Sequence, residues 1–119
     1  MARVKRGVTK HRRHTRLLAQ TQGHQGVRHL LYRRAKESLL HAMAYSYAHR
    51  RERKGDFRRL WILRIGAAAR QGGITYNAFM HGLKTANVGV DRKVLADLAV
   101  RDPSAFSQLV AVARGHLGS

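Results

Sequence analysis

Among the side chains that could bind a ligand or take part in catalysis, the basic ones are the most abundant in this sequence. Their distribution along the chain is uneven. Among 119 residues there are 24 Lys and Arg against 6 Asp and Glu, which gives a formal net charge of +18. Residues 1–70 hold 19 basic and 3 acidic side chains (net +16), and residues 71–119 hold 5 and 3 (net +2). Repulsion among so many like charges opposes a compact fold of residues 1–70. A polyanion would relieve it and release counterions.

Most of the basic residues are arginine rather than lysine. A guanidinium presents a planar fork to phosphate and a flat face that stacks on bases, whereas an ammonium group acts as a point charge. The composition therefore favours close contact with nucleic acid.

The sequence contains no set of residues that would support catalysis. There is no Cys, which excludes disulfides, Cys-ligated zinc and thiol nucleophiles. His11 and His14 have a spacing that suits a metal on a helix, but no carboxylate or Cys completes a ligand set. Two of the six acids, Asp91 and Asp102, stand where helix N-caps belong. We therefore expect no enzyme activity, no metal and no cofactor.

The first part of the chain is expected to contain a basic tail and two helices. Residues 1–9 are predicted to be extended, and Thr9 is the expected cap of a short helix ending near Gln22. Gly23 and Gly26 form a Gly-x-x-Gly sequence, which clamps nucleic acid in the KH fold. No KH-like strand pattern surrounds it, so a helix-to-helix turn is the preferred interpretation.

A long helix is predicted from about Val27 to Arg70, where there is no Pro and most residues favour helix. Such a helix would be about 65 Å long, so much of it would project from a small domain. Basic residues crowd Arg50–Arg59 on all sides of the helix, and no protein core holds a helix of that kind. Gly55 could break it, so one helix and two pieces both remain open.

The rest of the chain is expected to form a small helical core. Three short helices are predicted, with N-caps at Thr75, Asp91 and Asp102-Pro103. Their apolar faces should close on the end of the long helix, and we expect these core residues: Phe57, Leu60, Trp61, Ile65, Ala68, Tyr76, Phe79, Met80, Leu83, Val94, Leu95, Leu98, Ala99, Phe106, Leu109, Val110 and Ala113. The predicted fold class is all-α, with a basic extension over residues 1–58 and a small helical domain over residues 59–119.

Nothing in the sequence indicates a secretory signal or a membrane-spanning stretch, so a cytosolic protein is expected. Three other classes of protein fit the sequence less well. A DNA-architectural protein would be expected to offer a minor-groove wedge or a dimer face. A membrane-surface helix would need a strongly amphipathic pattern, which Arg50–Arg59 lacks. An RNA-modifying enzyme would need a catalytic set.

The sequence resembles the bacterial large-subunit ribosomal protein L-twenty family over essentially its whole length. The similarity begins with Met1-Ala2-Arg3-Val4-Lys5-Arg6-Gly7-Val8 and includes Gly73-Ile74-x-Tyr76-x-x-Phe79-x-x-Gly82-Leu83-Lys84 and Asp91-Arg92-Lys93-x-Leu95-Ala96-Asp97. Its most specific segment is Arg50-Arg51-x-Arg53-Lys54-x-x-Phe57-Arg58-x-Leu60-Trp61-Ile62-x-Arg64-Ile65-x-Ala67-Ala68-Ala69-Arg70-Gln71. One departure is Gly66, where the family usually has Asn.

The resemblance implies a structural constituent of the large ribosomal subunit, located in the cytoplasm. It implies direct binding to large-subunit rRNA, support of early subunit assembly, and contacts with neighbouring large-subunit ribosomal proteins. In some bacteria the family also represses its own operon mRNA through the small domain. No membrane and no small-molecule substrate is implied.

The residues expected to contact rRNA come mostly from the basic extension. They should position the protein on phosphate and ribose, while RNA shape provides specificity. The extension is expected to order on binding RNA. The expected set is Arg3, Lys5, Arg6, Lys10, His11, Arg12, Arg13, Arg16, Arg28, Tyr32, Arg33, Arg34, Arg50, Arg51, Arg53, Lys54, Arg58, Arg59 and Arg64.

Overall fold

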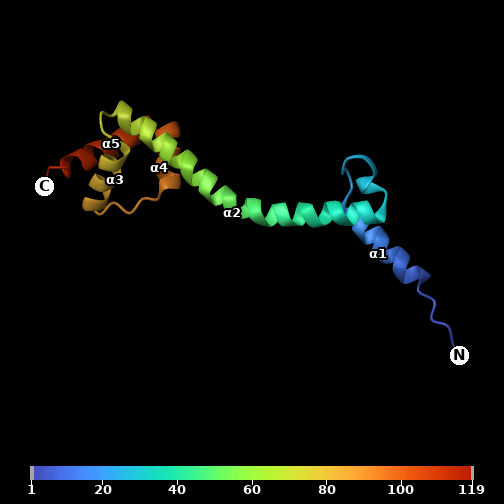
Figure 1. The fold of residues 1–119 in the computed structure, drawn as a ribbon. Coiled ribbons are helices and arrows are strands. Elements are labelled where there is room, and N and C mark those ends of the chain that lie inside the picture. The colour runs from blue at the N-terminus through green and yellow to red at the C-terminus, as the bar shows by residue number, and fades with distance from the viewer. Residues whose placement is uncertain (1, 119) are drawn as a thin grey trace. The chain divides into compact units, whose positions relative to one another are not determined.

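The computed structural model describes residues 2–118, so Met1 of the opening motif lies outside the described residues. Residues 2–118 form helices and turns without any strand, which confirms the predicted all-α class. The elements are α1 (Gly7–Gln20), a 3-10 turn η1 (Gly26–His29), α2 (Tyr32–Gln71), α3 (Tyr76–Thr85), α4 (Arg92–Arg101) and α5 (Pro103–Gly115) (Figure 1).

The chain forms two compact units, one ending at Arg51 and one beginning at Glu52, and α2 contributes residues to both. Each unit is described by itself below. The predicted boundary after residue 58 stays a prediction.

Two predicted helix starts in the first unit were wrong. α1 begins at Gly7, and its N-cap position is Arg6, which makes no side-chain capping hydrogen bond; Thr9 lies inside the helix. The Lys10 N–H donates to the Arg6 carbonyl at 3.0 Å, which closes the first turn earlier than expected. α2 begins at Tyr32 rather than near Val27, because the preceding residues form the tighter η1 turn.

Two glycines shape the connection between α1 and α2. Gly23 and Gly26 have φ angles of 82° and 64°, a region that favours glycine. These glycines lie between helices, which confirms the predicted helix-to-helix turn. No strand adjoins them in residues 2–118, so the KH interpretation is wrong.

α2 is continuous through Gly55, which decides between one helix and two pieces. Every residue from His49 to Leu60 is exposed, as expected for a helix segment that no protein core covers. Phe57 and Leu60 were predicted to lie in the core but are 48% and 36% exposed, so the part of α2 that packs on the core of the second unit begins only at Trp61.

The second unit is built around one apolar core, to which all four of its helices contribute. The rings of Phe79 and Phe106 meet at 5.0 Å at its centre. Val94, which was predicted to point inward, is 48% exposed, because Leu95 and Ala96 take the inward positions of α4. The buried residues are Ile65, Ala69, Phe79, Leu83, Leu95, Ala96, Phe106, Val110 and Ala113.

The three N-caps predicted in the second unit are all present. Thr75 Oγ1 accepts from the Ala78 N–H at 3.3 Å, and Asp91 Oδ1 accepts from the Val94 N–H at 2.8 Å. Asp102 Oδ1 accepts from the Ala105 N–H at 3.0 Å, with Pro103 as the first residue of α5. These side chains satisfy N–H groups that a helix leaves without intrahelical partners.

The C-termini of α2 and α3 end in the same motif. At the end of α2, Gly73 has a φ of 78° and the Ile74 N–H reaches back to the Ala69 carbonyl at 3.1 Å. At the end of α3, Asn87 has a φ of 55° and the Val88 N–H reaches the Leu83 carbonyl at 2.9 Å. Both are Schellman endings, which require a residue that tolerates positive φ.

The packing of α3 against α5 requires a glycine at position 82, whereas packing does not require the glycines at positions 55 and 66 of α2. A Cβ on Gly82 would lie 2.4 Å from the Ala113 carbonyl oxygen, so α3 and α5 approach closely only because the side chain is absent. A Cβ on Gly66, the position that departs from the family pattern, would make an ordinary 3.9 Å contact with Tyr76. A Cβ on Gly55 would meet nothing within 4 Å.

We predict that Gly82→Ala destabilises the second unit by about 2–4 kcal/mol, because α5 must move to relieve the clash. Gly66→Ala, the matched control in α2, should stabilise the same unit by about 0.5–1 kcal/mol, because alanine favours helix more than glycine. Urea denaturation followed by tryptophan fluorescence of Trp61 measures both changes. Equal stability of the two variants would contradict the close-approach argument.

Stability of the second unit should also depend on ionisation of Asp102. The Ser104 hydroxyl donates to its carboxylate at 2.6 Å, and this bond, followed by the Ala105 N–H, lowers the pKa of Asp102 below its ordinary value of 3.8. The folded state therefore favours the ionised carboxylate. Its stabilising effect is present above pH 3.8 and is lost as the pH falls through the lower folded-state pKa.

We predict that Asp102→Asn reduces the loss of stability on acidification below about pH 4. Asparagine keeps a capping oxygen but does not titrate. Urea midpoints measured at pH 7 and at a series of acidic pH values provide the test. An unchanged acid dependence in the variant would show that other groups dominate it.

Candidate nucleic-acid interface

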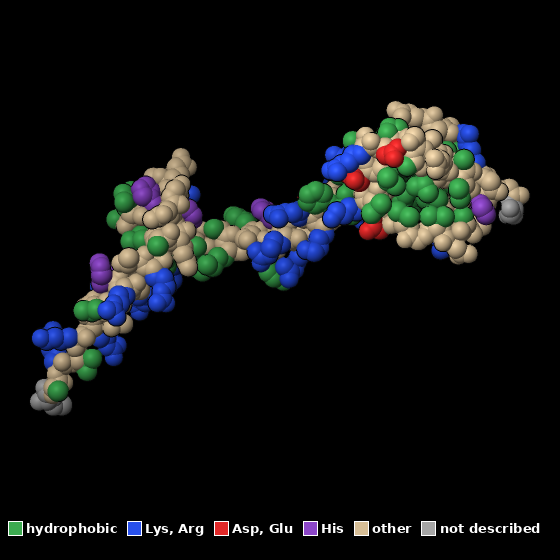
Figure 2. Space-filling view, turned by 180° about the vertical axis from the view of Figure 1, so that it is seen from behind, with side chains coloured by type: hydrophobic (Ala, Val, Ile, Leu, Met, Phe, Trp, Pro, Cys, Tyr) green, Lys and Arg blue, Asp and Glu red, His purple; other side chains and the backbone are tan. Residues whose placement is uncertain are grey.

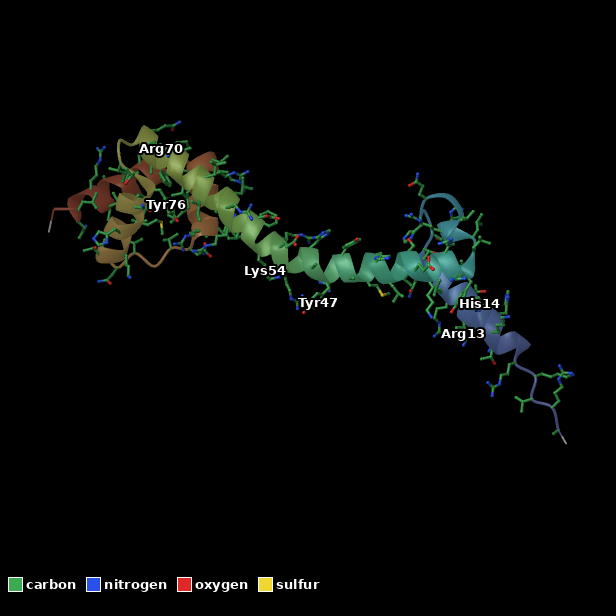
Figure 3. All side chains as sticks on the ribbon, viewed as in Figure 1. Arg13, His14, Tyr47, Lys54, Arg70 and Tyr76 are labelled. Carbon is green, nitrogen blue, oxygen red and sulfur yellow. The ribbon has the colours of Figure 1, made fainter. Side chains whose placement is uncertain are left out.

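The predicted RNA-contacting residues are exposed in the structure, with Tyr32 as the exception. Lys and Arg side chains are spread along the surface of the helices that precede the core of the second unit (Figure 2). Arg13 and His14 extend from α1, and Tyr47 and Lys54 extend from the middle of α2 (Figure 3). Long cationic side chains on such a surface can reach phosphate oxygens without rearrangement of a core.

Four of the predicted residues line one open hollow at the start of α1. Lys5 and Arg6 precede the helix, and Lys10 and Arg13 are three residues apart, which places them on one side of it. The first turn of α1 contains no acidic residue. The hollow combines cationic side chains with the positive end of a helix, which suits a phosphate group.

Tyr32 lies against α1 where α1 and α2 meet. We call this region, which contains His14, Thr21, His24, Tyr32 and Ser38, the corner of the first unit. Its ring stacks on His14 with 3.7 Å between ring centroids and an angle of 13°. Removal from water lowers the pKa of His14, and the neighbouring Lys10, Arg13 and His11 side chains lower it further, which favours the neutral imidazole. The contact between α1 and α2 here is therefore made by two uncharged rings.

Two further contacts hold the corner. Thr21 is fully buried, and its hydroxyl donates to the Leu18 carbonyl at 3.1 Å. His24 Nδ1 and the Ser38 hydroxyl lie 2.6 Å apart and connect the turn to α2. Sequence reasoning missed His14 and His24 as packing residues, because their partners Tyr32 and Ser38 are far away in the chain. It also missed the burial of Thr21.

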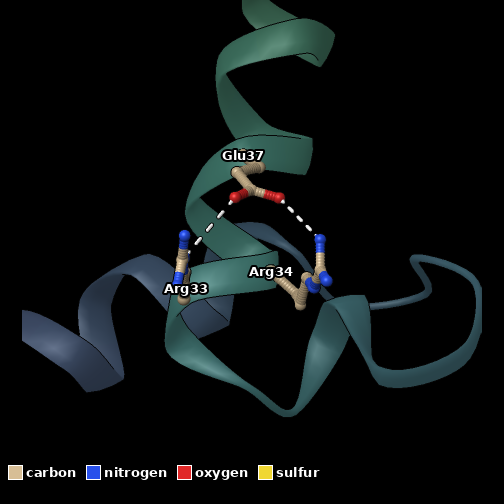
Figure 4. A network of polar contacts seen from close by, with 3 residues as sticks. All are labelled: Arg33, Arg34 and Glu37. Carbon is tan, nitrogen blue, oxygen red and sulfur yellow. Dashed lines mark hydrogen bonds and ion pairs between the residues drawn. The ribbon is translucent and has the colours of Figure 1, made fainter.

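Glu37 orients two of the predicted arginines. Its carboxylate lies 3.8 Å from Arg33 Nε and 3.2 Å from an Arg34 nitrogen (Figure 4). Exposed pairs of this kind add little stability, so their effect is to restrict where the guanidinium groups lie. Sequence reasoning also missed Glu37, although its spacing of four and three residues from the arginines is the expected signal.

Arginines of the middle of α2 are positioned by residues one turn earlier. The guanidinium carbon of Arg51 lies 3.5 Å from the centre of the Tyr47 ring, and the Arg50 guanidinium donates to the Ser46 hydroxyl at 2.6 Å. In the second unit, Arg59 lies 3.4 Å from Asp56. Such contacts reduce the rotamer freedom that binding would otherwise remove.

The structure adds no catalytic or metal-binding geometry to this surface. In residues 2–118 no three His, Asp or Glu side chains gather closely enough to hold a metal ion. No helix in that range is both long enough and apolar enough to cross a membrane.

Comparison with known proteins gives one consistent result. The family model described as "Ribosomal protein L20" matches residues 3–109. The chain is 65% identical over 114 residues to the "Large ribosomal subunit protein bL20" of Thermomicrobium roseum, covering 96% of this chain and 97% of that protein. It is 58% identical over 113 residues to the protein of the same name from Dehalococcoides mccartyi (95% of each chain), and 54% identical over 118 residues to that of Moorella thermoacetica (99% and 98%).

We predict that replacing Arg53 and Arg58 together by Gln lowers the slope of log affinity against log salt for a generic RNA duplex. Each lost phosphate contact removes roughly 0.7–0.9 from that slope. Arg70→Gln is the control, because Arg70 is an exposed arginine of the same helix that lies outside the predicted RNA-contacting set. Filter binding at several salt concentrations measures the slopes. Equal slopes for wild type and the double variant would remove these two arginines from the interface.

Proposed function

Because the chain belongs to the ribosomal protein L20 family, we propose that it is a constituent of the large ribosomal subunit that binds large-subunit rRNA directly and supports an early step of subunit assembly. The family is a structural component of the ribosome, so the protein is not an enzyme. Its location is the cytoplasm, in the large subunit with neighbouring ribosomal proteins.

The observation that supports rRNA binding best is the exposed basic segment of α2. From Arg50 to Arg59 the helix holds six exposed Lys and Arg side chains against Glu52 and Asp56. A continuous helix of this composition gains nothing from a protein core and leaves its repulsion unrelieved. Phosphate groups provide the missing opposite charge, which is why an RNA partner fits this segment.

RNA shape rather than sequence is the proposed basis of recognition. The deep groove of an A-form helix does not admit side chains that read bases, whereas its phosphates and riboses are accessible. The basic side chains of the first unit and of Arg53–Arg59 are spread along helices, so they suit backbones that run beside those helices. We propose that the extension becomes ordered when it binds RNA.

A second activity, repression of the protein's own operon mRNA through the small domain, is favoured by one surface of the second unit. An open hollow there is lined by Trp61 and by the cations Arg64, Lys93 and Arg101. Asp91 and Asp97 also line it, and Asp97 pairs with Arg101. An aromatic ring among basic side chains suits RNA contact.

Binding of the full-length chain to large-subunit rRNA fragments tests the main proposal. We predict that one rRNA fragment stays tightly bound at high salt, whereas RNA and DNA duplexes of equal length lose affinity steeply, because only shape-matched contacts survive screening. Filter binding across a salt series measures this difference. Parallel weakening of all three nucleic acids would leave only phosphate attraction and would favour a DNA-architectural protein instead.

A further inference from the structure

Three rings form a ladder on one side of α2 that the proposed function leaves without a role. His41, Tyr45 and His49 follow one another at intervals of four residues. Their ring centroids are 6.1 Å and 5.9 Å apart, and the angles between the ring planes are 25° and 10°. We call these three residues the ring ladder.

The ring ladder is open, in contrast to the other ring pair of the first unit. His14 and Tyr32 are in full face contact at 3.7 Å, whereas rings 6 Å apart leave part of each face uncovered. All three ladder residues are exposed, and Tyr45 at the centre retains 59% of its accessible surface. The rings are therefore held nearly parallel by the helix without being covered by the protein.

The tyrosines of this unit have three different environments. Tyr32 packs on His14, and one face of Tyr47 is occupied by the Arg51 guanidinium at 3.5 Å. Tyr45 has only the two neighbouring imidazoles beside it. It is the tyrosine whose ring remains available to a flat ligand.

Charge divides the two sides of α2 within the first unit. At 3.6 residues per turn, Lys36, Arg50 and Arg51 lie roughly 120–180° around the helix from Tyr45. On the ladder side, Arg34 is paired with Glu37 at 3.2 Å, which reduces the net positive charge there. Phosphates are drawn to the side that carries Lys36, Arg50 and Arg51, whereas the ladder side presents aromatic faces.

We propose that the ring ladder is a stacking platform for unpaired RNA bases, centred on Tyr45. Exposed aromatic faces stack on bases that have left a helix, whereas a base inside a duplex has both faces occupied by its neighbours. The cations on the other side of α2 hold the RNA backbone nearby. The partner is an RNA with a bulge or internal loop, and this proposal rests on the proposed rRNA binding.

The test compares two RNA hairpins with equal numbers of base pairs, one fully paired and one with a bulge of three adenosines. The middle adenosine is replaced by 2-aminopurine, whose fluorescence falls on stacking. The full-length proteins are wild type, Tyr45→Leu, Tyr45→Phe and Tyr47→Leu. Leucine has a higher helix propensity than tyrosine, so a loss in Tyr45→Leu does not come from weaker helix formation.

Tyr45→Leu should bind the bulged hairpin about tenfold more weakly and leave the paired hairpin unaffected, since one base–aromatic stack accounts for such a change. Tyr45→Phe should bind like wild type and quench 2-aminopurine, whereas Tyr45→Leu should not quench it. Tyr47→Leu, equally conservative and on the opposite side, should keep the preference for the bulge.

Three results would overturn the proposal: no preference of wild type for the bulge, equal weakening of both hairpins by Tyr45→Leu, or the same effect from Tyr47→Leu. If the bulge preference fails while an rRNA fragment still binds tightly at high salt, the platform is refuted and rRNA binding stands. If the rRNA fragment is bound no better than a generic duplex, the rRNA-binding function itself fails.

Discussion

Repulsion among the basic side chains of residues 1–70 is the constraint on which the rest of the structure depends. It limits the buried core of the second unit to the last turns of α2 and the three short helices after it. It also explains how the few acids are used. Glu37, Asp56 and Asp97 each pair with an arginine three or four residues away, and Asp91 and Asp102 cap helices. These acids make local contacts, and the net charge remains for an external partner.

The same constraint determines what packs in the first unit. Where α1 meets α2, the contacts are made by uncharged groups: the stacked rings of His14 and Tyr32, the buried Thr21 and the small Ala35. The lowered pKa of His14 keeps a further positive charge out of this corner. A basic protein can thus fold locally wherever it interrupts its run of cations with neutral residues of the right size.

The helix content, the three N-caps and most of the core were predictable, because periodicity, caps and Pro103 are local signals. The start of α1, the exposure of Phe57 and Val94, and the corner were not. Those features depend on which face of a helix finds a partner, and the sequence pattern does not contain that information. The ring ladder could have been found from its spacing of four residues, but its openness required coordinates. The basic character of the interface was predictable from charge alone, whereas the order imposed by Glu37, Ser46 and Tyr47 was not.

The C-terminal end of α2 is held by its own glycine and by a contact from α5. Gly73 closes it with a Schellman ending, and the Arg114 guanidinium from α5 donates to the Gly72 carbonyl. Helix formation needs a costly first turn, after which each added residue is easy. Helix growth is therefore expected to begin at this packed end, from which α2 would extend backward along the chain. Synthesis proceeds in the opposite direction, so the basic segment leaves the translating ribosome before the residues that nucleate its helix have been made. For that interval the cations of the extension are a newly made polyelectrolyte, and a polyanion that binds them would order the segment before its own nucleus exists.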